Sequence, residues 1–173
     1  SVIEGDVAVA TQFSGLQFDH LLFTGSTAVG RRVAQAAAVH LTPTTLELGG
    51  KSPQVVFEDA DLDRALPFLV NAGIQNAGQT CSASSRILVQ RSVHDRLLER
   101  MAERYRALKV GPAIDDLDVG PLVSGRQQEI VGGFLGDLGG GEITARGEIV
   151  SAAPRGGHYL APTLVSGVTP DNR

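Results

Sequence analysis

The chain has 173 residues, 42% of them hydrophobic, and a net charge of −4, which is the composition of one globular domain or two small ones. The balance of 15 Lys and Arg against 19 Asp and Glu argues against nucleic acid or an anionic membrane as a partner, because both require a basic patch. The single cysteine excludes an internal disulfide framework and a zinc site built from several cysteines. The four histidines show no HxxxH or HxH spacing, so no metal site is predicted.

No apolar run approaches the length of a membrane span, and no charged-then-apolar leader is visible. The pattern therefore predicts a cytoplasmic protein without a membrane partner.

The first part of the chain alternates strand, helix and strand before a further short strand. The predicted elements are residues 19–24, 26–40, 44–48 and 54–57. The first of them is an apolar run stopped by Gly25, which is typical of a buried strand. The helix is rich in alanine and is expected to start with Ser26 or Thr27 as its cap.

The rest of the chain continues the alternation. We expect three helices: one that begins after residues 59–61 and whose apolar stripe reaches residue 77, one from residue 92 that ends before 111, and one from about residue 124. Strands are expected at 86–90, 143–145 and 159–165. Pro67 lies inside the first of these helices and should kink it or delay its start. Ser92 with Asp95 three residues later resembles a capping box. The alternation predicts an α/β fold with mostly parallel strand pairing.

The last helix is expected to turn one apolar face inward. The residues of this face are Ile130, Val131, Phe134, Leu135 and Leu138.

The first candidate motif is FTGSTAVG at residues 23–30, where a strand is predicted to pass into a helix. Gly25 allows the backbone to approach a ligand closely, and Ser26 can donate to a phosphate at the helix N-terminus. The motif is neither GxGxxG nor a Walker A loop, since Arg31 stands where the latter needs Lys. A tight structural turn explains these residues equally well.

The second candidate is Glu47, which ends a predicted strand and precedes Gly49 and Gly50. Parallel α/β sheets bind ligands at the carboxyl ends of their strands, so a carboxylate at this place is a candidate functional group. The following Lys and Ser imitate a Walker A loop, but Thr45 stands where that loop needs Gly. The alternative for Glu47 is a capped or salt-bridged structural carboxylate.

The third candidate is Cys81, within the sequence GQTCS at residues 78–82. It follows a predicted helix and lies in a short polar segment before the strand at 86–90. A cysteine in such a loop is a candidate nucleophile, whereas a lone cysteine elsewhere is most often a small buried hydrophobe.

In this order and spacing the motifs resemble the NAD(P)-dependent aldehyde dehydrogenase superfamily. The similar segments are FTGSTAVG at 23–30, LELGGKSP at 46–53 and NAGQTCSASSR at 76–86, with further agreement at 118–123 and 157–164. The resemblance extends from Gly5 onward and implies the central part of a family member. It implies the end of a Rossmann-like dinucleotide-binding domain at residues 1–48, followed by most of the α/β catalytic domain at 49–173.

The same resemblance implies two catalytic residues. Cys81 would add to the carbonyl carbon of a small-molecule aldehyde, and Glu47 would activate the water that hydrolyses the resulting thioester. The product is a carboxylic acid. The full-length parent is expected to be a homo-oligomer, and the 173-residue chain alone is expected to be inactive.

For the cofactor, NAD or NADP, the resemblance implies five positions. Gly25 and Ser26 would lie at the pyrophosphate and the nicotinamide side, and Gly30 would pack the helix behind them. The Leu48 carbonyl would hold the nicotinamide amide, and Gly5 would lie near the adenine.

Three alternatives remain open from the sequence. An acylating enzyme would transfer the acyl group to coenzyme A, but that branch typically lacks the glutamate found at Glu47. A cysteine hydrolase or acyltransferase would need a histidine against Cys81, and no motif supplies one. An inactive fragment could act as an oligomerising module.

Overall fold

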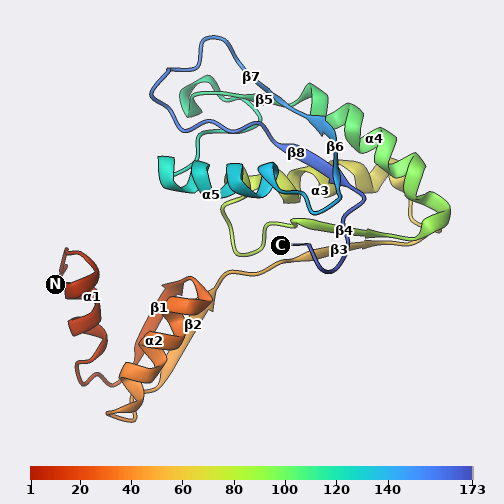
Figure 1. The fold of residues 1–173 in the computed structure, drawn as a ribbon. Coiled ribbons are helices and arrows are strands. Elements are labelled where there is room, and N and C mark those ends of the chain that lie inside the picture. Colours follow the sequence, from red (N-terminus) through yellow and green to blue (C-terminus); the bar gives the residue numbers. More distant parts are fainter. Residues whose placement is uncertain (173) are drawn as a thin grey trace. The chain divides into compact units, whose positions relative to one another are not determined.

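A computed structural model describes residues 1–172 as two compact units, Ser1–Gly50 and Lys51–Arg173, with Arg173 itself outside the described residues. Each unit is described by itself (Figure 1). Both mix helices and strands, and three of the four strand pairings described are parallel. The predicted α/β class with mostly parallel pairing is therefore confirmed.

The first unit has four elements: α1 (Val7–Ser14), β1 (Leu21–Gly25), α2 (Thr27–Ala38) and β2 (Thr44–Leu48). β1 and β2 pair in parallel, and α2 connects them and packs on both. The sequence analysis did not predict α1. Its signal is the Asp6 carboxylate, which accepts hydrogen bonds from two backbone N–H groups of the first turn.

The prediction that the first strand is buried was wrong for one of its faces. Leu21 is buried, but the next residue, Leu22, is 64% exposed. Successive residues of a strand point to opposite faces, and α2 packs against the face that carries Leu21. A two-stranded sheet with one helix on it leaves its other face exposed.

The second unit contains the remaining elements. Its strands are β3 (Pro53–Val56), β4 (Arg86–Val89), β5 (Lys109–Val110), β6 (Glu142–Arg146), β7 (Glu148–Ile149) and β8 (Thr163–Ser166). Its helices are α3 (Leu62–Ile74), η1 (Gln75–Gly78), η2 (Arg91–Val93), α4 (His94–Ala107), η3 (Ala113–Asp115) and α5 (Gly125–Gly136). β3 pairs with β4 and β5 with β7 in parallel, and β6 pairs with β8 antiparallel.

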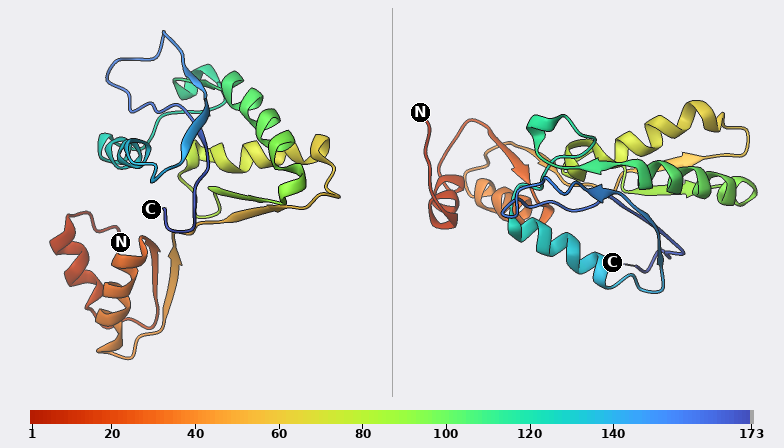
Figure 2. Two further views of the ribbon diagram at one scale, coloured as in Figure 1. Left: turned by 45° about the vertical axis from the view of Figure 1, so that its right-hand side comes forward. Right: turned by 90° about the horizontal axis from the view of Figure 1, so that it is seen from above.

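One hydrophobic core holds the second unit together. α3 and α4 pack side by side, and their apolar faces meet residues of β3 and β6 (Figure 2). Val70 and Leu97, at the centre of this contact, are each 1% exposed. Burial of such a side chain contributes about 1.5–3 kcal/mol, so this core is the main stabilising element of the unit.

The helix that contains Pro67 starts where the sequence predicts. α3 begins at Leu62, with the Asp61 carboxylate capping two N–H groups of its first turn. Pro67 therefore does not delay the start of the helix. Asp61 at the N-cap is the stronger signal, since it satisfies donors that the helix itself leaves unpaired.

Two predicted elements are shorter in the structure. α3 ends at Ile74 rather than at residue 77, because Asn76 and Ala77 have left-handed backbone. The strand predicted at residues 159–165 is confined to Thr163–Ser166, where β8 pairs with β6.

The capping box predicted at Ser92 is absent. The Ser92 hydroxyl donates instead to the Glu58 carboxylate at 2.8 Å, and α4 begins at His94 after the short helix η2. Its N-cap is Val93, which makes no side-chain capping bond.

The inward face predicted for the last helix is only partly correct. Ile130 and Phe134 are 45% and 47% exposed, whereas Val131 and Leu135 line a cavity. Leu138 lies beyond the end of α5. No residue of α5 is fully buried, so this glycine-rich helix makes only a shallow contact with its unit.

None of the helices in residues 1–172 has the length and apolarity that crossing a membrane requires.

Candidate active site

The first two motifs meet at one edge of the first unit. β1 and β2 run in parallel, so their carboxyl ends lie side by side. The register places Thr24 opposite Glu47 and Gly25 opposite Leu48. The carboxyl ends of parallel strands are the usual ligand-binding edge of α/β sheets.

Gly25 and Ser26 form the tight passage from β1 into α2. Gly25 has φ of +154°, and a Cβ at this position would lie 2.7 Å from the Phe23 ring. Ser26 is the N-cap of α2, and its hydroxyl accepts from the Val29 N–H at 3.3 Å. The first turn of a helix leaves backbone N–H groups without acceptors, and these favour an anion.

The other glycines have different surroundings. A Cβ on Gly30 would lie 2.7 Å from Leu48, so Gly30 lets α2 approach β2 closely. Gly5 is exposed, and a Cβ there would meet Val9 at 2.5 Å. No atom lies within 4 Å of a Cβ built on Gly49, so packing does not require a glycine there.

Glu47 is exposed at the end of β2. Among residues 1–172 no group forms a hydrogen bond or ion pair with its carboxylate. The structure therefore offers no support for the alternative of a salt-bridged structural carboxylate. Its carboxylate is available to bind or move a proton.

Cys81 belongs to the second unit, where it lies in the loop between η1 and β4 and is exposed. Its carbonyl accepts from the Ser52 hydroxyl at 3.5 Å. The backbone N–H of Ser84 donates to the Ala72 carbonyl of α3 at 2.9 Å, which fixes the far end of the loop. This exposed thiol does not fit the alternative of a small buried hydrophobe.

Two further side chains, those of Arg86 and Gln79, hold the cysteine loop. The Arg86 guanidinium donates from Nε to the Lys51 carbonyl at 2.9 Å, beside the first pair of β3 and β4. The Gln79 side chain bonds both to the turn before the loop and to the segment before α5. The Arg and Gln in the segment around Cys81 are the sequence signal for these ties.

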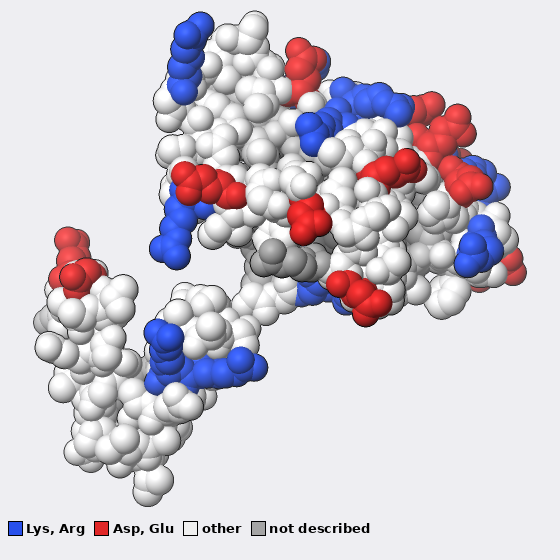
Figure 3. Space-filling view, in the orientation of Figure 1, with Lys and Arg blue, Asp and Glu red and all other residues white. Residues whose placement is uncertain are grey.

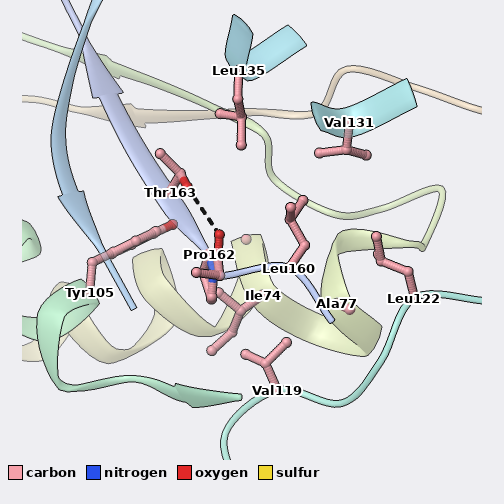
Figure 4. A pocket seen from close by; sticks show the side chains of 12 residues that line it. Ile74, Ala77, Tyr105, Val119, Leu122, Val131, Leu135, Leu160, Pro162 and Thr163 are labelled. Carbon is pink, nitrogen blue, oxygen red and sulfur yellow. Dashed lines mark hydrogen bonds between the residues drawn. The ribbon is translucent and has the colours of Figure 1, made fainter. Parts of the chain in front are cut away.

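A mostly apolar cavity of about 170 Å³ lies under α5, and Ala77, four residues before Cys81, is in its wall (Figure 4). The Tyr105 side chain points into it from α4, and burial raises the pKa of this phenol. On the face of the molecule in Figure 3, acidic and basic side chains are interspersed over the second unit. The lining of the cavity is thus more apolar than the charged surface of the second unit seen in Figure 3.

The sequence pattern of the aldehyde dehydrogenase family matches residues 2–173. The chain belongs to the aldehyde dehydrogenase family. The resemblance inferred from the three motifs is thereby confirmed.

Individual family members support this membership. The betaine aldehyde dehydrogenase of Rhizobium johnstonii is 42% identical over 151 residues, covering 86% of this chain and 31% of the relative. A crystal structure described as an aldehyde dehydrogenase from Burkholderia cenocepacia is 53% identical with a TM-score of 0.87, covering 88% of this chain and 33% of that one. The betaine aldehyde dehydrogenase of Staphylococcus aureus, solved with NAD+, is 33% identical with a TM-score of 0.84, covering 91% and 32%. The chain spans about a third of the length of the relatives it matches.

Proposed function

We propose that the polypeptide carrying these residues oxidises an aldehyde to a carboxylic acid with NAD or NADP, using Cys81 as nucleophile and Glu47 as general base. The observation that carries this proposal is the exposed Cys81 thiol, held in a hydrogen-bonded loop of a chain that belongs to the aldehyde dehydrogenase family. The betaine aldehyde dehydrogenases among its relatives support a small aldehyde as substrate. A homo-oligomer is part of the same proposal.

The first step is addition of the Cys81 thiolate to the carbonyl carbon. The new bond joins Sγ to the carbonyl carbon, and the π electron pair of the carbonyl moves to its oxygen, which becomes an oxyanion. Among residues 1–172 no group accepts a hydrogen bond from the Cys81 backbone N–H, so this donor is free for the oxyanion. NAD(P)+, held by Gly25, Ser26 and the Leu48 carbonyl, would supply the acceptor for the hydride of the aldehyde carbon, and Cys81 would then carry the thioester.

The second step is hydrolysis of that thioester. Glu47 removes a proton from water, the resulting hydroxide adds to the thioester carbon, and the carbon–sulfur bond breaks. The carboxylic acid leaves, and Cys81 returns to the thiolate. A positioned general base typically contributes 10²–10⁴-fold, roughly, to such a step. The unpaired Glu47 carboxylate is suited to that role.

For the cofactor we propose the edge formed by β1 and β2. Gly25 and Ser26 would contact the pyrophosphate and nicotinamide side, the Leu48 carbonyl would accept from the nicotinamide amide, and Gly30 would keep α2 close to β2. Gly5 near the adenine completes the proposal. The observation in favour is the side-chain-free turn at Gly25, which continues into the N-terminus of α2.

The test uses the fact that Cys81 is the only cysteine of the sequence. In the polypeptide that carries it, Cys81→Ala should lower aldehyde-dependent NAD(P)H formation by at least about 10⁴-fold, the order seen when a covalent nucleophile is removed. In the 173-residue chain, iodoacetamide should label the unaltered protein once and the Cys81→Ala variant not at all. In the polypeptide that carries it, NAD should change the rate at which Cys81 is labelled. Aldehyde oxidation that survives Cys81→Ala would refute the proposal.

The 173-residue chain by itself is proposed not to sustain turnover. Its first unit leaves one sheet face exposed, and positioning of cofactor and thiol contributes on the order of 7–11 kcal/mol to reactions of this kind. Calorimetric titration with NAD, beside an NADH assay with several aldehydes, tests this. Micromolar binding with sustained turnover would contradict it.

A further inference from the structure

A strained turn immediately precedes the cysteine loop. Asn76, Ala77 and Gly78 are consecutive and have φ of 51°, 55° and 76°. Left-handed backbone is unfavourable for a residue that carries a Cβ, so Asn76 and Ala77 must be held in this conformation by their surroundings. Cys81 follows only three residues after this turn, so its direction depends on what holds the turn.

The amide of Gln79 supplies such a hold. Its Nε2 donates to the Asn76 carbonyl at 3.1 Å, and its Oε1 accepts from the Val123 backbone N–H at 3.0 Å. The Asn76 amide returns a bond to the Gln79 carbonyl at 3.4 Å. One partner of the Gln79 amide is a carbonyl and the other is an N–H, so its orientation is fixed by chemistry.

The far end of this tie is anchored in the second unit. Leu122, next to Val123, is buried, and its N–H donates to the His158 carbonyl at 2.8 Å. The Gln128 side chain donates to the Tyr159 carbonyl at 2.7 Å, which links α5 to the same segment. The two segments that resemble the family at 118–123 and 157–164 are thus joined by a hydrogen bond and support the far end of the tie.

We propose that Gln79 is a positioning residue, whose amide holds the left-handed turn against Val123 and so sets the direction of the Cys81 thiol. This inference rests on the proposed function of Cys81 as nucleophile. Gln79 itself takes no part in bond making. A misplacement of a reacting group by about 1 Å can cost on the order of 10²-fold in rate, so the loss of this hold should be visible in the acylation step.

Three variants separate the roles of the amide. Gln79→Met keeps the length of the side chain and removes both hydrogen bonds. Gln79→Glu keeps an acceptor for the Val123 N–H, but its ionised carboxylate cannot donate to the Asn76 carbonyl. Val123→Ala is the matched control, because it keeps the backbone N–H and removes a side chain that is 82% exposed.

The experiment measures the burst of NADH, kcat, KM and the melting temperature in the polypeptide that carries these residues. Gln79→Met should lower the burst rate about 10- to 100-fold with KM changed less than about twofold. At alkaline pH, Gln79→Glu should lower the burst rate as much as Gln79→Met does. As the pH falls, its burst rate relative to that of the unaltered protein should recover, because a protonated carboxyl can donate to the Asn76 carbonyl. Val123→Ala should match the unaltered protein.

The outcomes are decisive for Gln79 separately from Cys81. An unchanged burst in Gln79→Met, or in Gln79→Glu should the Met variant not fold, would overturn the positioning role while Cys81→Ala remains inactive. A Gln79→Glu variant whose relative rate does not recover at low pH would also overturn it. Activity in Cys81→Ala would instead refute the proposed function on which this inference rests.

Discussion

The two units of the chain differ in how much apolar core supports the residues of the proposed chemistry. In Ser1–Gly50 the buried apolar side chains are few, among them Leu21, Val33 and Ala37, while Leu22 and Leu41 are 64% and 89% exposed. In the second unit a continuous core joins α3, α4 and their neighbouring strands. A two-stranded sheet is marginally stable by itself, whereas two helices packed on strands bury enough apolar surface to be stable.

The difference also appears in how each unit positions its functional groups. At the β1–β2 edge the proposed contacts are mostly backbone, through Gly25, the start of α2 and the Leu48 carbonyl, so they depend on strand register. In the second unit the loop that contains Cys81 is held by side-chain hydrogen bonds, among them those of Gln79 and Arg86. Apart from Cys81 itself, substitutions in the second unit should therefore act through packing or positioning, whereas a change of Glu47 in the first unit should act through chemistry.

The largest effect expected in the first unit comes from its proposed base, Glu47. In the polypeptide that carries these residues, Glu47→Gln should slow steady-state turnover by about 10²–10⁴-fold, because the amide cannot take a proton from water. The first turnover should still release a burst of NADH, since addition of Cys81 does not need Glu47. Rapid-mixing absorbance distinguishes burst from turnover.

The control for this prediction is Cys81→Ser, which should abolish the burst as well. Steady-state turnover that is unchanged in Glu47→Gln would reject the base assignment. Coenzyme A that restores turnover in this variant, but does nothing for the unaltered protein, would show that deacylation is the step it lost.

The next effect compares the two units by stability. Leu97→Ala removes a side chain that is 1% exposed and should lower the free energy of unfolding by about 2–5 kcal/mol, the range for large-to-small changes in a core. Leu22→Ala makes the same chemical change at an exposed site and should cost less than about 0.5 kcal/mol. Urea unfolding followed by circular dichroism measures both. Equal losses would mean that Leu22 is covered in solution, and the contrast between the units would fail.

The sequence predicted best what is decided locally. The strand at 44–48 agrees with β2 residue for residue, and Ser26 is the cap that the Ser-Thr pair suggested. Three motifs in a fixed order were enough to identify the family, which the match over residues 2–173 confirms. The roles of Cys81 and Glu47 stay predictions.

What the sequence did not predict depends on partners far along the chain. The exposure of Leu22 follows from the number of strands and helices around it, which no local pattern states. Ser92 resembled a helix cap, but its hydroxyl donates a hydrogen bond to the carboxylate of Glu58, 34 residues away in the sequence. The tie from Gln79 to Val123 spans 44 residues, so the polar character of Gln79 was visible but its partner was not.

A smaller effect compares the caps of the two units. Ser26→Ala and Asp61→Ala each remove an N-cap side chain and should lower the free energy of unfolding by about 0.5–2 kcal/mol. Only Ser26 lies at the proposed cofactor edge, so only Ser26→Ala should also weaken NAD binding in calorimetry. Equal affinity of both variants for NAD would remove Ser26 from the cofactor site and would leave it a structural cap.

The smallest effect on stability near neutral pH is expected from Tyr105, which is buried in the core of the second unit. The sequence has two tyrosines, both after Lys51, and burial raises the pKa of Tyr105 above its ordinary value of 10.0. The folded state therefore holds the phenol proton more tightly than the unfolded chain. The stabilisation is complete below about pH 10 and is lost as the pH rises through the higher pKa of the folded state. Tyr105→Phe cannot ionise, so its free energy of unfolding should stay near that of the unaltered protein at pH 7 and should fall less between pH 9 and pH 11, as urea unfolding at each pH would show. An identical alkaline loss in both proteins would mean that Tyr105 is solvated in the folded state, and the second unit would then be more open at α4 than its core implies.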